Sequence, residues 1–353
     1  MHKAIHKILL LLIASQISML YSQFDINENK YNIYAVNLPE KISFANETTP
    51  LHDYKIKERL DKELLINTYW QSKTILLIKR ANKYFPIIEK ILMNHNIPDD
   101  FKYLAVAESG LENTTSPSGA KGFWQFLKKT GIEYELEINS EIDERYHLEK
   151  STKAACQYLQ EAYDLFGSWT LAAAAYNMGK NGLLKNIKKQ KVNSYYDLML
   201  NSETHRYVFR ILAIKEIISN HQEYGFIINE DDYYNQPEYY TANIDTSITN
   251  IADFGIKMGL NYKKIKELNP WILGNTITNK DKKRYQLKIV SNTKPKQSTI
   301  DTIYHMCQAR ENIFEISRKY NVDVNNILQW NNLLPSKKIK KNQKIIILKS
   351  HEY

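Results

Sequence analysis

The sequence predicts a mainly α-helical protein, in which one all-helical domain is followed by two small modules of strand, helix, helix and strand. From Ile56 onward, apolar residues recur at steps of three and four, which is the period of an amphipathic helix. After about residue 225 this pattern gives way to Tyr- and Asn-rich sequence that contains an internal repeat. A chain of 353 residues, of which 43% are hydrophobic, can form two or three packed domains.

The helical domain is expected to span residues 56–224. Its first helical pattern starts at Ile56, and Pro86 is expected to divide it into two helices, because proline lacks the backbone N–H. A new helix should start after Asp100, which stands where an aspartate can cap the N-terminus. The alanine-rich stretch 169–176 predicts a short and tightly packed helix.

The repeat lies in the C-terminal part, where residues 250–269 align without a gap with residues 312–331. β-prone runs flank both copies, so each copy predicts a strand, two short helices and a second strand. We expect one diverged module over 239–290 and another over 301–349, joined by a linker at 291–300. The identical pairs are Asn250 and Asn312, Ile251 and Ile313, Ile265 and Ile327, and Asn269 and Asn331.

The N-terminus has the pattern of a secretory signal over residues 1–22. Lys3 and Lys7 precede a short apolar core that is too short to predict a membrane span, so the mature protein is expected to have none. The segment contains no cysteine, which argues against a lipoprotein, and we expect export to the periplasm or cell envelope. The alternative is a membrane anchor formed by the uncleaved segment. Residues 23–55 should follow as an extended leader with little fixed structure.

Charge and cysteine content narrow the partners and cofactors. The formal net charge of +9 suits a polyanionic partner such as nucleic acid, an anionic membrane or an acidic cell-wall polymer, or only favours solubility. The secretory signal argues against nucleic acid. Cys156 and Cys307 are far apart in sequence, so neither a disulfide framework nor a metal cluster is expected, and Cys156 is expected to be a buried structural thiol. We therefore predict no metal and no cofactor.

The segment 107–127 carries the strongest candidate for chemistry. Glu108 falls on the same helical face as Phe101 and Leu104, and burial raises the pKa of a carboxyl group toward the range that a general acid needs. The alternative is an exposed and inert Glu at a fraying helix end, and position alone does not decide between the two. A turn-rich stretch over 112–119 follows, and then an aromatic run in which Trp124 is expected to be core.

Several motifs in this order resemble the catalytic domain of soluble lytic transglycosylases, glycoside hydrolase family 23, which has a lysozyme-like helical fold. The motifs are Glu108-Ser109, Ser116, Gly119-Ala120, the run from Gly122 to Phe126, Asp143-Glu144-Arg145, Ala175-Tyr176-Asn177, Glu203-Thr204 and Tyr207-Val208. The sequence departs from the family pattern at Leu127-Lys128, Met178-Gly179 and His205.

The repeated modules resemble LysM modules, small folds that bind N-acetylglucosamine polymers. In the second copy, Ala309-Arg310-Glu311 replaces the usual Gly-Asp before the first helix. A catalytic domain followed by such modules is similar to the layout of membrane-bound lytic murein transglycosylases of the D type. Either copy could instead be a structural module that binds nothing.

The resemblance implies a peptidoglycan lytic transglycosylase, which cleaves the β-1,4 bond between N-acetylmuramic acid and N-acetylglucosamine without water. The products would carry 1,6-anhydromuramic ends, and Glu108 would act first as acid and then as base. The implied substrate-binding residues are Ser116, Gln125, Tyr176 and Asn177, with Glu203 and Tyr207 in supporting roles. In this interpretation Tyr176 hydrogen-bonds near Glu108 and orients it. The alternatives are a core tyrosine at Tyr176 and an amide that ties down its own loop at Gln125.

Two other functions remain open at this point. One is a lysozyme- or chitinase-type hydrolase of the same polymers, and the other is a non-catalytic wall-binding protein. In each case the partner is a glycan strand of the cell wall, and we expect a monomer that binds no nucleic acid.

Overall fold

The computed structural model describes residues 33–290, 299–309, 311–331, 333 and 339–351. The chain divides into two compact units, Met1–Glu135 with Leu148–Asn235, and Leu136–His147 with Gln236–Tyr353. The first unit is built mainly of helices and the second of two-stranded sheets with short helices, so the predicted mainly α fold is confirmed. The expected signal over 1–22 lies outside the described residues. Among the described helices, none has the length and apolar character needed to cross a membrane.

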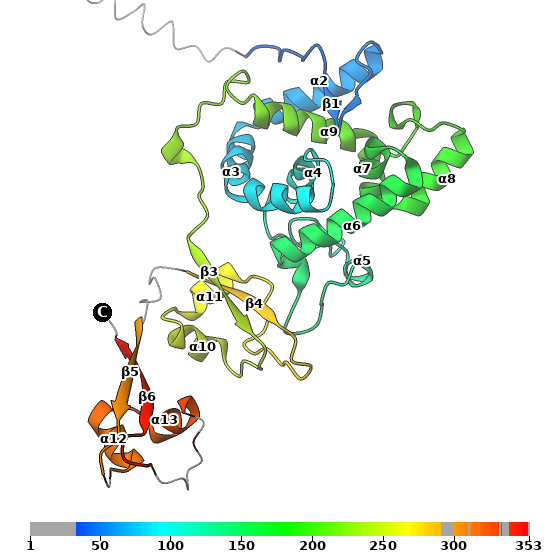
Figure 1. Cartoon of the computed structure of the whole chain (residues 1–353). Helices are drawn as coiled ribbons and strands as arrows, with labels where there is room; N and C mark the ends of the chain where they lie inside the picture. The colour runs from blue at the N-terminus through cyan, green and yellow to red at the C-terminus, as the bar shows by residue number, and fades with distance from the viewer. Residues whose placement is uncertain (1–32, 291–298, 310, 332, 334–338, 352–353) are drawn as a thin grey trace, which may run out of the picture. The chain divides into compact units, whose positions relative to one another are not determined.

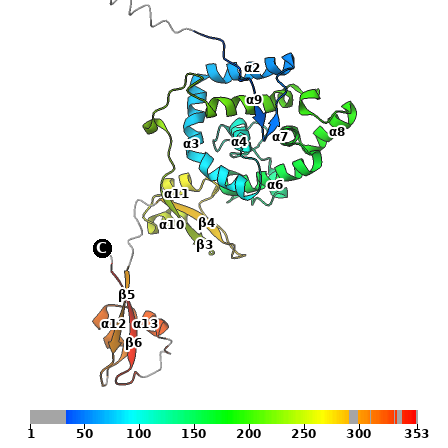
Figure 2. The same cartoon turned by 45° about the horizontal axis from the view of Figure 1, so that its top comes forward.

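The helices of the first unit surround α4, which lies in the middle of α3, α6, α7 and α9 (Figures 1 and 2). This arrangement buries most residues of α4. The elements of this unit are β1 (Ser43–Phe44), β2 (Glu47–Thr48), α2 (Tyr54–Tyr69), α3 (Gln71–Asn94), α4 (Phe101–Ser109), α5 (Lys128–Glu133), α6 (Leu148–Phe166), α7 (Trp169–Met178), α8 (Lys180–Gln190), η2 (Tyr195–Asp197), α9 (Ser202–Ser219) and η3 (Glu230–Asp232).

Two details of the helical prediction are wrong. Helix α3 runs through Pro86 without ending, because the proline removes one N–H from a 24-residue helix whose neighbouring Phe85 and Ile88 are buried. Asp100 precedes α4 but makes no capping hydrogen bond. Its carboxylate instead accepts from the Ala45 N–H and pairs with Lys215, each at 2.7 Å, and this ion pair is the stronger interaction.

Part of the segment expected to be a leader with little fixed structure forms β1 and β2 and belongs to the core. The two strands form an antiparallel hairpin, and Phe44 at its centre is fully buried against the ring of Phe101 at 5.0 Å. The Glu47 carboxylate accepts hydrogen bonds at the N-terminus of α7, including one from the Thr170 N–H at 2.9 Å. A negative charge at this end of a helix is stabilising. The leader prediction is therefore wrong here, because Phe44 packs into the core and the Glu47 carboxylate binds the start of α7.

The second unit contains two modules of strand, helix, helix and strand, as the repeat predicted. Each module has its own antiparallel two-stranded sheet and its own hydrophobic core. Of the predicted linker, residues 291–298 lie outside the described residues and the last two belong to β5. The elements are η1 (Glu144–Tyr146), β3 (Tyr239–Ile244), α10 (Ile251–Lys257), α11 (Tyr262–Leu268), β4 (Tyr285–Val290), β5 (Thr299–Met306), α12 (Ile313–Tyr320), α13 (Val324–Trp330) and β6 (Lys344–His351).

The two asparagines that end the repeat make the same contacts in both modules. The Asn269 side chain donates to the Lys288 carbonyl and accepts from the Lys288 N–H, both at 2.8 Å. The Asn331 side chain does the same with Ile346, at 2.8 and 2.7 Å. Each amide thus joins the end of the second helix to the last strand, which explains why the repeat retains an asparagine at this position.

The first module also incorporates residues 136–147, which come from the stretch between α5 and α6. Ile142 is 1% exposed within the module's core and forms a β-bridge with Ile272. The Glu141 carbonyl accepts from the Leu273 N–H at 2.7 Å, and its carboxylate accepts from the Thr278 N–H at 2.7 Å. The expected helical domain is therefore interrupted, because part of its sequence completes the core of a module about 100 residues later.

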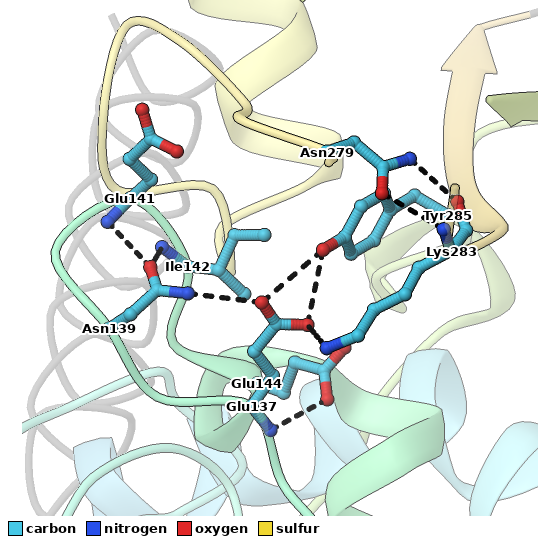
Figure 3. A network of polar contacts seen from close by, with 8 residues as sticks. All are labelled: Glu137, Asn139, Glu141, Ile142, Glu144, Asn279, Lys283 and Tyr285. Atoms are coloured by element: carbon cyan, nitrogen blue, oxygen red, sulfur yellow. Dashed lines mark hydrogen bonds and ion pairs between the residues drawn. The ribbon is translucent and has the colours of Figure 1, made fainter. Parts of the chain in front are cut away.

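Polar contacts hold the same segment in place (Figure 3). The Glu137 carboxylate accepts from the Tyr285 hydroxyl at 3.1 Å and pairs with Lys283 at 3.3 Å. Asn139 lies beside it and donates to Glu137 at 3.0 Å, while Glu144 accepts from the Glu137 N–H at 2.9 Å. The segment is thus fixed by hydrogen bonds as well as by apolar contacts.

Candidate active site

A cavity of about 510 Å³ opens in the first unit beside the C-terminal end of α4. Its volume lies in the range of ligand-binding sites. Residues from α4, α7, α9 and the loop that follows α4 line it, so segments far apart in the sequence converge on one space. All seven residues predicted from the sequence line this cavity, namely Glu108, Ser116, Gln125, Tyr176, Asn177, Glu203 and Tyr207.

Glu108 lies in the last turn of α4 and faces the cavity. Its carboxylate accepts a hydrogen bond from the Tyr207 hydroxyl. Burial raises the pKa of Glu108 to about 7, against the opposing effects of the Tyr207 hydrogen bond and the Arg210 charge, while the nearby Glu203 raises it further. Near neutral pH the group therefore exists in both protonation states, which suits proton transfer in either direction.

The backbone around Glu108 is held by side chains on both sides of it. The helix ends at Gly110, whose φ of +63° is the left-handed conformation that glycine adopts at low cost. The Ser109 hydroxyl donates to the Phe123 carbonyl at 2.8 Å, and the Arg210 guanidinium donates to the Ala107 carbonyl. These contacts fix the position from which the Glu108 side chain projects.

The tyrosine that contacts Glu108 is Tyr207, not Tyr176. The Tyr176 hydroxyl donates to the Trp124 carbonyl at 2.7 Å, and its ring packs edge-on against Phe126. The expected hydrogen bond from Tyr176 toward Glu108 is therefore absent among the described contacts, and Tyr207 on α9 makes it instead. Each tyrosine belongs to one of the sequence motifs, but only the packing of α9 against α4 determines which hydroxyl reaches the carboxylate.

The loop residues Ser116 and Gln125 stabilise their own loop while they line the cavity. Gln125 has a φ of +50°, and its amide nitrogen donates to the Gly122 carbonyl at 2.7 Å and the Thr114 carbonyl at 3.2 Å. The Ser116 hydroxyl accepts from the Ala120 N–H at 3.0 Å. Gln125 thus makes the contacts expected of an amide that ties down its loop, and both of its donors are used in doing so.

A second carboxylate, Glu203, lines the cavity from the start of α9. Asn177 on α7 contacts this part of α9 twice. Its amide nitrogen lies 3.4 Å from a Glu203 oxygen, and its amide oxygen accepts from the Thr204 hydroxyl at 2.7 Å. This chain of hydrogen bonds connects the ends of α7 and α9. Glu203 is exposed, whereas Glu108 is partly buried.

Sequence reasoning missed Arg210, which is the only cationic residue among those described as lining the cavity. It follows Tyr207 by three positions on α9, and this spacing places both on one face of the helix. The spacing was present in the sequence, but it has meaning only once Tyr207 is known to contact Glu108.

Trp124 and Cys156 have the structural roles predicted for them. Trp124 is fully buried and donates from its indole nitrogen to the Thr152 hydroxyl at 2.8 Å. Cys156 is buried and unpaired, and burial raises the pKa of its thiol to about 12, which makes it a poor nucleophile. Neither side chain lines the cavity.

Among the residues that the structure describes, the fold brings together one group of possible metal ligands that the sequence spacing did not predict. The ligand atoms of His305, Cys307 and Glu311 lie within 4.8 Å of one another in the second module. The His305 ring pairs with the Glu311 carboxylate at 2.8 Å, and the same carboxylate accepts from the Gln308 N–H at 2.8 Å. These hydrogen bonds explain the grouping as a structural contact in the loop before α12.

Comparison with sequence families matches three consecutive parts of the chain. Residues 85–199 match the transglycosylase SLT domain. Residues 240–298 match the soluble lytic transglycosylase C-terminal LysM-like domain, and residues 306–348 match the LysM domain. The chain carries a transglycosylase SLT domain and two LysM-type domains. The resemblance noted in the sequence motifs is thereby confirmed at the level of domains.

Among curated proteins, the chain is 26% identical over 311 residues to membrane-bound lytic murein transglycosylase D of Escherichia coli K12, and the same values hold for that of Escherichia coli O6:H1. The match covers 80% of this chain and 66% of each relative. A putative tributyltin chloride resistance protein of an Alteromonas species is 26% identical over 133 residues, which is 36% of this chain and 64% of that protein. The chain thus spans about two thirds of the length of these relatives.

Proposed function

We propose that the protein is a lytic transglycosylase that cleaves the MurNAc–GlcNAc β-1,4 bond of peptidoglycan and leaves 1,6-anhydromuramic ends. The observation that carries the proposal is a single carboxyl group, Glu108, held by Tyr207 in a cavity where burial raises its pKa to about 7. This group can give a proton and take one back at the same pH. The SLT domain and the name of the Escherichia coli relatives support the same reaction.

In the first step, protonated Glu108 gives its proton to the glycosidic oxygen as the bond from that oxygen to the muramyl anomeric carbon breaks. The leaving sugar departs with a free hydroxyl, and Glu108 becomes a carboxylate. The Tyr207 hydroxyl donates to this carboxylate and stabilises it. The bonding electrons leave with the oxygen, so the muramyl anomeric carbon becomes oxocarbenium-like and is ready for attack in the second step.

In the second step, the Glu108 carboxylate takes the proton from the muramyl 6-hydroxyl, whose oxygen attacks the anomeric carbon of the same sugar. The new bond closes the 1,6-anhydro ring, and Glu108 returns to its protonated form. No water is consumed, because the nucleophile is already held within the substrate. One carboxyl group is therefore sufficient for the whole reaction.

The remaining cavity residues are proposed to bind the glycan. Ser116 and Gln125 shape the loop on one side, and Tyr176 and Asn177 form the side contributed by α7. Glu203 is proposed to support Asn177 and to keep the proton on Glu108. We propose no metal and no cofactor for this reaction.

The second candidate function is hydrolysis, and Glu203 is the observation that favours it. Most glycosidases that use water need two carboxyl groups, and Glu203 places a second one in the same cavity. As a hydrolase of peptidoglycan or chitin, the enzyme would leave a reducing end that contains one additional water.

We further propose that the LysM-type domains hold the enzyme on peptidoglycan strands, and that it works as a monomer in the periplasm or cell envelope. The signal-like segment over 1–22 supports export, and the absence of cysteine in that segment argues against lipid attachment. We propose a helical catalytic domain within 56–224 that excludes residues 136–147, one module over 239–290 and another over 301–349 whose first strand starts at Thr299.

Digestion of purified peptidoglycan, with mass spectrometry of the released fragments, tests the proposal. Anhydromuramic ends are expected, whereas reducing ends in their place would favour the hydrolase. The Glu108→Gln variant should release neither product while its circular dichroism matches that of the parent. Release of either product by that variant would assign the chemistry to another residue. A parallel digestion of chitin, which lacks N-acetylmuramic acid, shows whether the enzyme requires that sugar.

A further inference from the structure

We propose that Arg210 is a positioning residue for Glu108, which it holds through the preceding peptide group while its charge opposes that of Glu203 on the same face of α9. The inference deepens the function proposed above and rests on it. Arg210 belongs to none of the motifs from which the site was recognised in the sequence.

The first observation is a backbone contact. Helix α4 ends at Ser109, so the carbonyl of Ala107 is one of the last four in the helix, which lack an intrahelical partner. The Arg210 guanidinium donates a hydrogen bond to this carbonyl. A cation at the C-terminal end of a helix is also stabilising. Arg210 therefore caps α4 at the residue immediately before Glu108.

The second observation is the arrangement of charge along α9. Glu203, Tyr207 and Arg210 follow one another at steps of four and three, and all three line the cavity that Glu108 faces. The hydroxyl at the centre contacts Glu108 directly, while an acid precedes it and a base follows it. One helix face thus presents the Glu108 carboxyl group with a donor, an anion and a cation.

The two charges affect Glu108 in opposite directions. Arg210 lowers the pKa of Glu108 and Glu203 raises it, and both act on a group whose pKa burial has already raised. Tyr176 on α7 also interacts with Glu108, and burial raises the pKa of Tyr176 well above its usual range, so it stays neutral. Lys73 on α3 is close enough to Arg210 for the two cations to repel each other.

The proposed reaction requires the opposing effects of Arg210 and Glu203 on Glu108 to be balanced. Glu108 becomes negative in the first step and neutral again in the second, so an environment that favours one state too strongly slows one of the two steps. A guanidinium that is bonded to the backbone beside Glu108 can favour the carboxylate without forming an ion pair that would keep it ionised. Arg210 thus differs from Tyr207, which contacts the carboxyl group itself.

The test compares Arg210→Gln, Arg210→Lys and Glu203→Gln in the full chain. The alkaline limb of the rate profile reports the loss of the Glu108 proton. Arg210→Gln should move this limb up by about half to one pH unit, Glu203→Gln should move it down, and Arg210→Lys should leave it close to the parent position. Lys62→Gln removes an exposed charge on α2 and is the matched control, with no shift expected.

A second measurement does not depend on activity. Titration of the Glu108 carboxyl signal by NMR, assigned through its absence in Glu108→Gln, should show the same opposite shifts in the folded variants. An unchanged Glu108 titration in Arg210→Gln would overturn the proposal and leave Arg210 as a helix cap only. Reducing ends from the parent enzyme, together with the expected shifts, would instead contradict the transglycosylase function and keep the role of Arg210.

Discussion

Two regions of the molecule bury a carboxylate in different ways. Asp143 is 1% exposed, and the Arg145 guanidinium donates to both of its oxygens at 2.9 and 2.7 Å. Glu108 receives its side-chain hydrogen bond from the neutral hydroxyl of Tyr207, and Arg210 acts on it only through the adjacent backbone and by its charge. The bidentate pair makes Asp143 a structural group, whereas Glu108 can hold or release a proton.

Burial alone does not make a carboxylate reactive, as the difference between Asp143 and Glu108 shows. Both acids stand in motifs typical of lytic transglycosylases, Asp143 before Glu144-Arg145 and Glu108 before Ser109. They differ in the group that donates hydrogen bonds to the carboxylate, which is the Arg145 guanidinium for Asp143 and the Tyr207 hydroxyl for Glu108. This difference is expected to control both activity and stability.

The largest effect is expected for Glu108→Gln. Loss of a general acid and base lowers the rate by roughly 10²- to 10⁴-fold, and more if both proposed steps depend on it. The measurement is the rate of anhydro-product release at pH 6. The control is Glu203→Gln, which should retain a larger fraction of the activity, and equal losses in the two variants would assign Glu203 a catalytic role.

The next effect concerns stability in the other region. Arg145→Met should destabilise the second unit by roughly 3–5 kcal/mol, because it leaves the buried Asp143 without its cation. Hydrogen exchange of the amides around Ile142 in the full chain measures the change locally. The paired change Asp143→Leu with Arg145→Met should recover much of the loss. Normal protection in Arg145→Met alone would show that the ion pair is dispensable.

Stability should also depend on pH through Glu108. Its pKa rises from 4.5 in the unfolded chain to about 7 in the folded protein, which corresponds to roughly 3 kcal/mol. The folded state therefore binds more protons in this window, and the stability of the first unit falls as pH rises from about 4.5 to above 7. Unfolding of parent and Glu108→Gln at pH 5 and pH 8 should show the variant gaining relative stability at pH 8. A constant difference would mean that Glu108 titrates normally.

The smallest effect separates the two tyrosines. Tyr207→Phe removes the donor to Glu108, so it should raise the Glu108 pKa and lower the rate by about ten- to a hundredfold, as expected for a hydrogen bond to a charged group. Tyr176→Phe removes a bond to the Trp124 carbonyl and should reduce the rate less. The measurement is the rate of product release as a function of pH for the parent, Tyr207→Phe and Tyr176→Phe. A larger loss in Tyr176→Phe would restore the role that the sequence suggested for it.

Much of the fold could be predicted from the sequence because it depends on local pattern. Apolar periodicity indicated the helices, and the repeated Asn269 and Asn331 indicated two modules of the same kind. The errors occurred where a distant partner outweighs a local preference. Pro86 is tolerated within a well-packed helix, and Asp100 pairs with Lys215 instead of capping α4.

The sequence by itself determined the candidates for chemistry, because Glu108, Tyr176, Asn177, Glu203 and Tyr207 all stand in recognisable motifs and all line one cavity. Only the tertiary structure decided which of them contact one another. The packing of α9 on α4 makes Tyr207 the partner of Glu108 and brings Arg210 to the same cavity. It also assigned residues 136–147 to the core of a module far along the chain. Motifs identify residue types, whereas the distances that control proton affinity depend on how the helices pack.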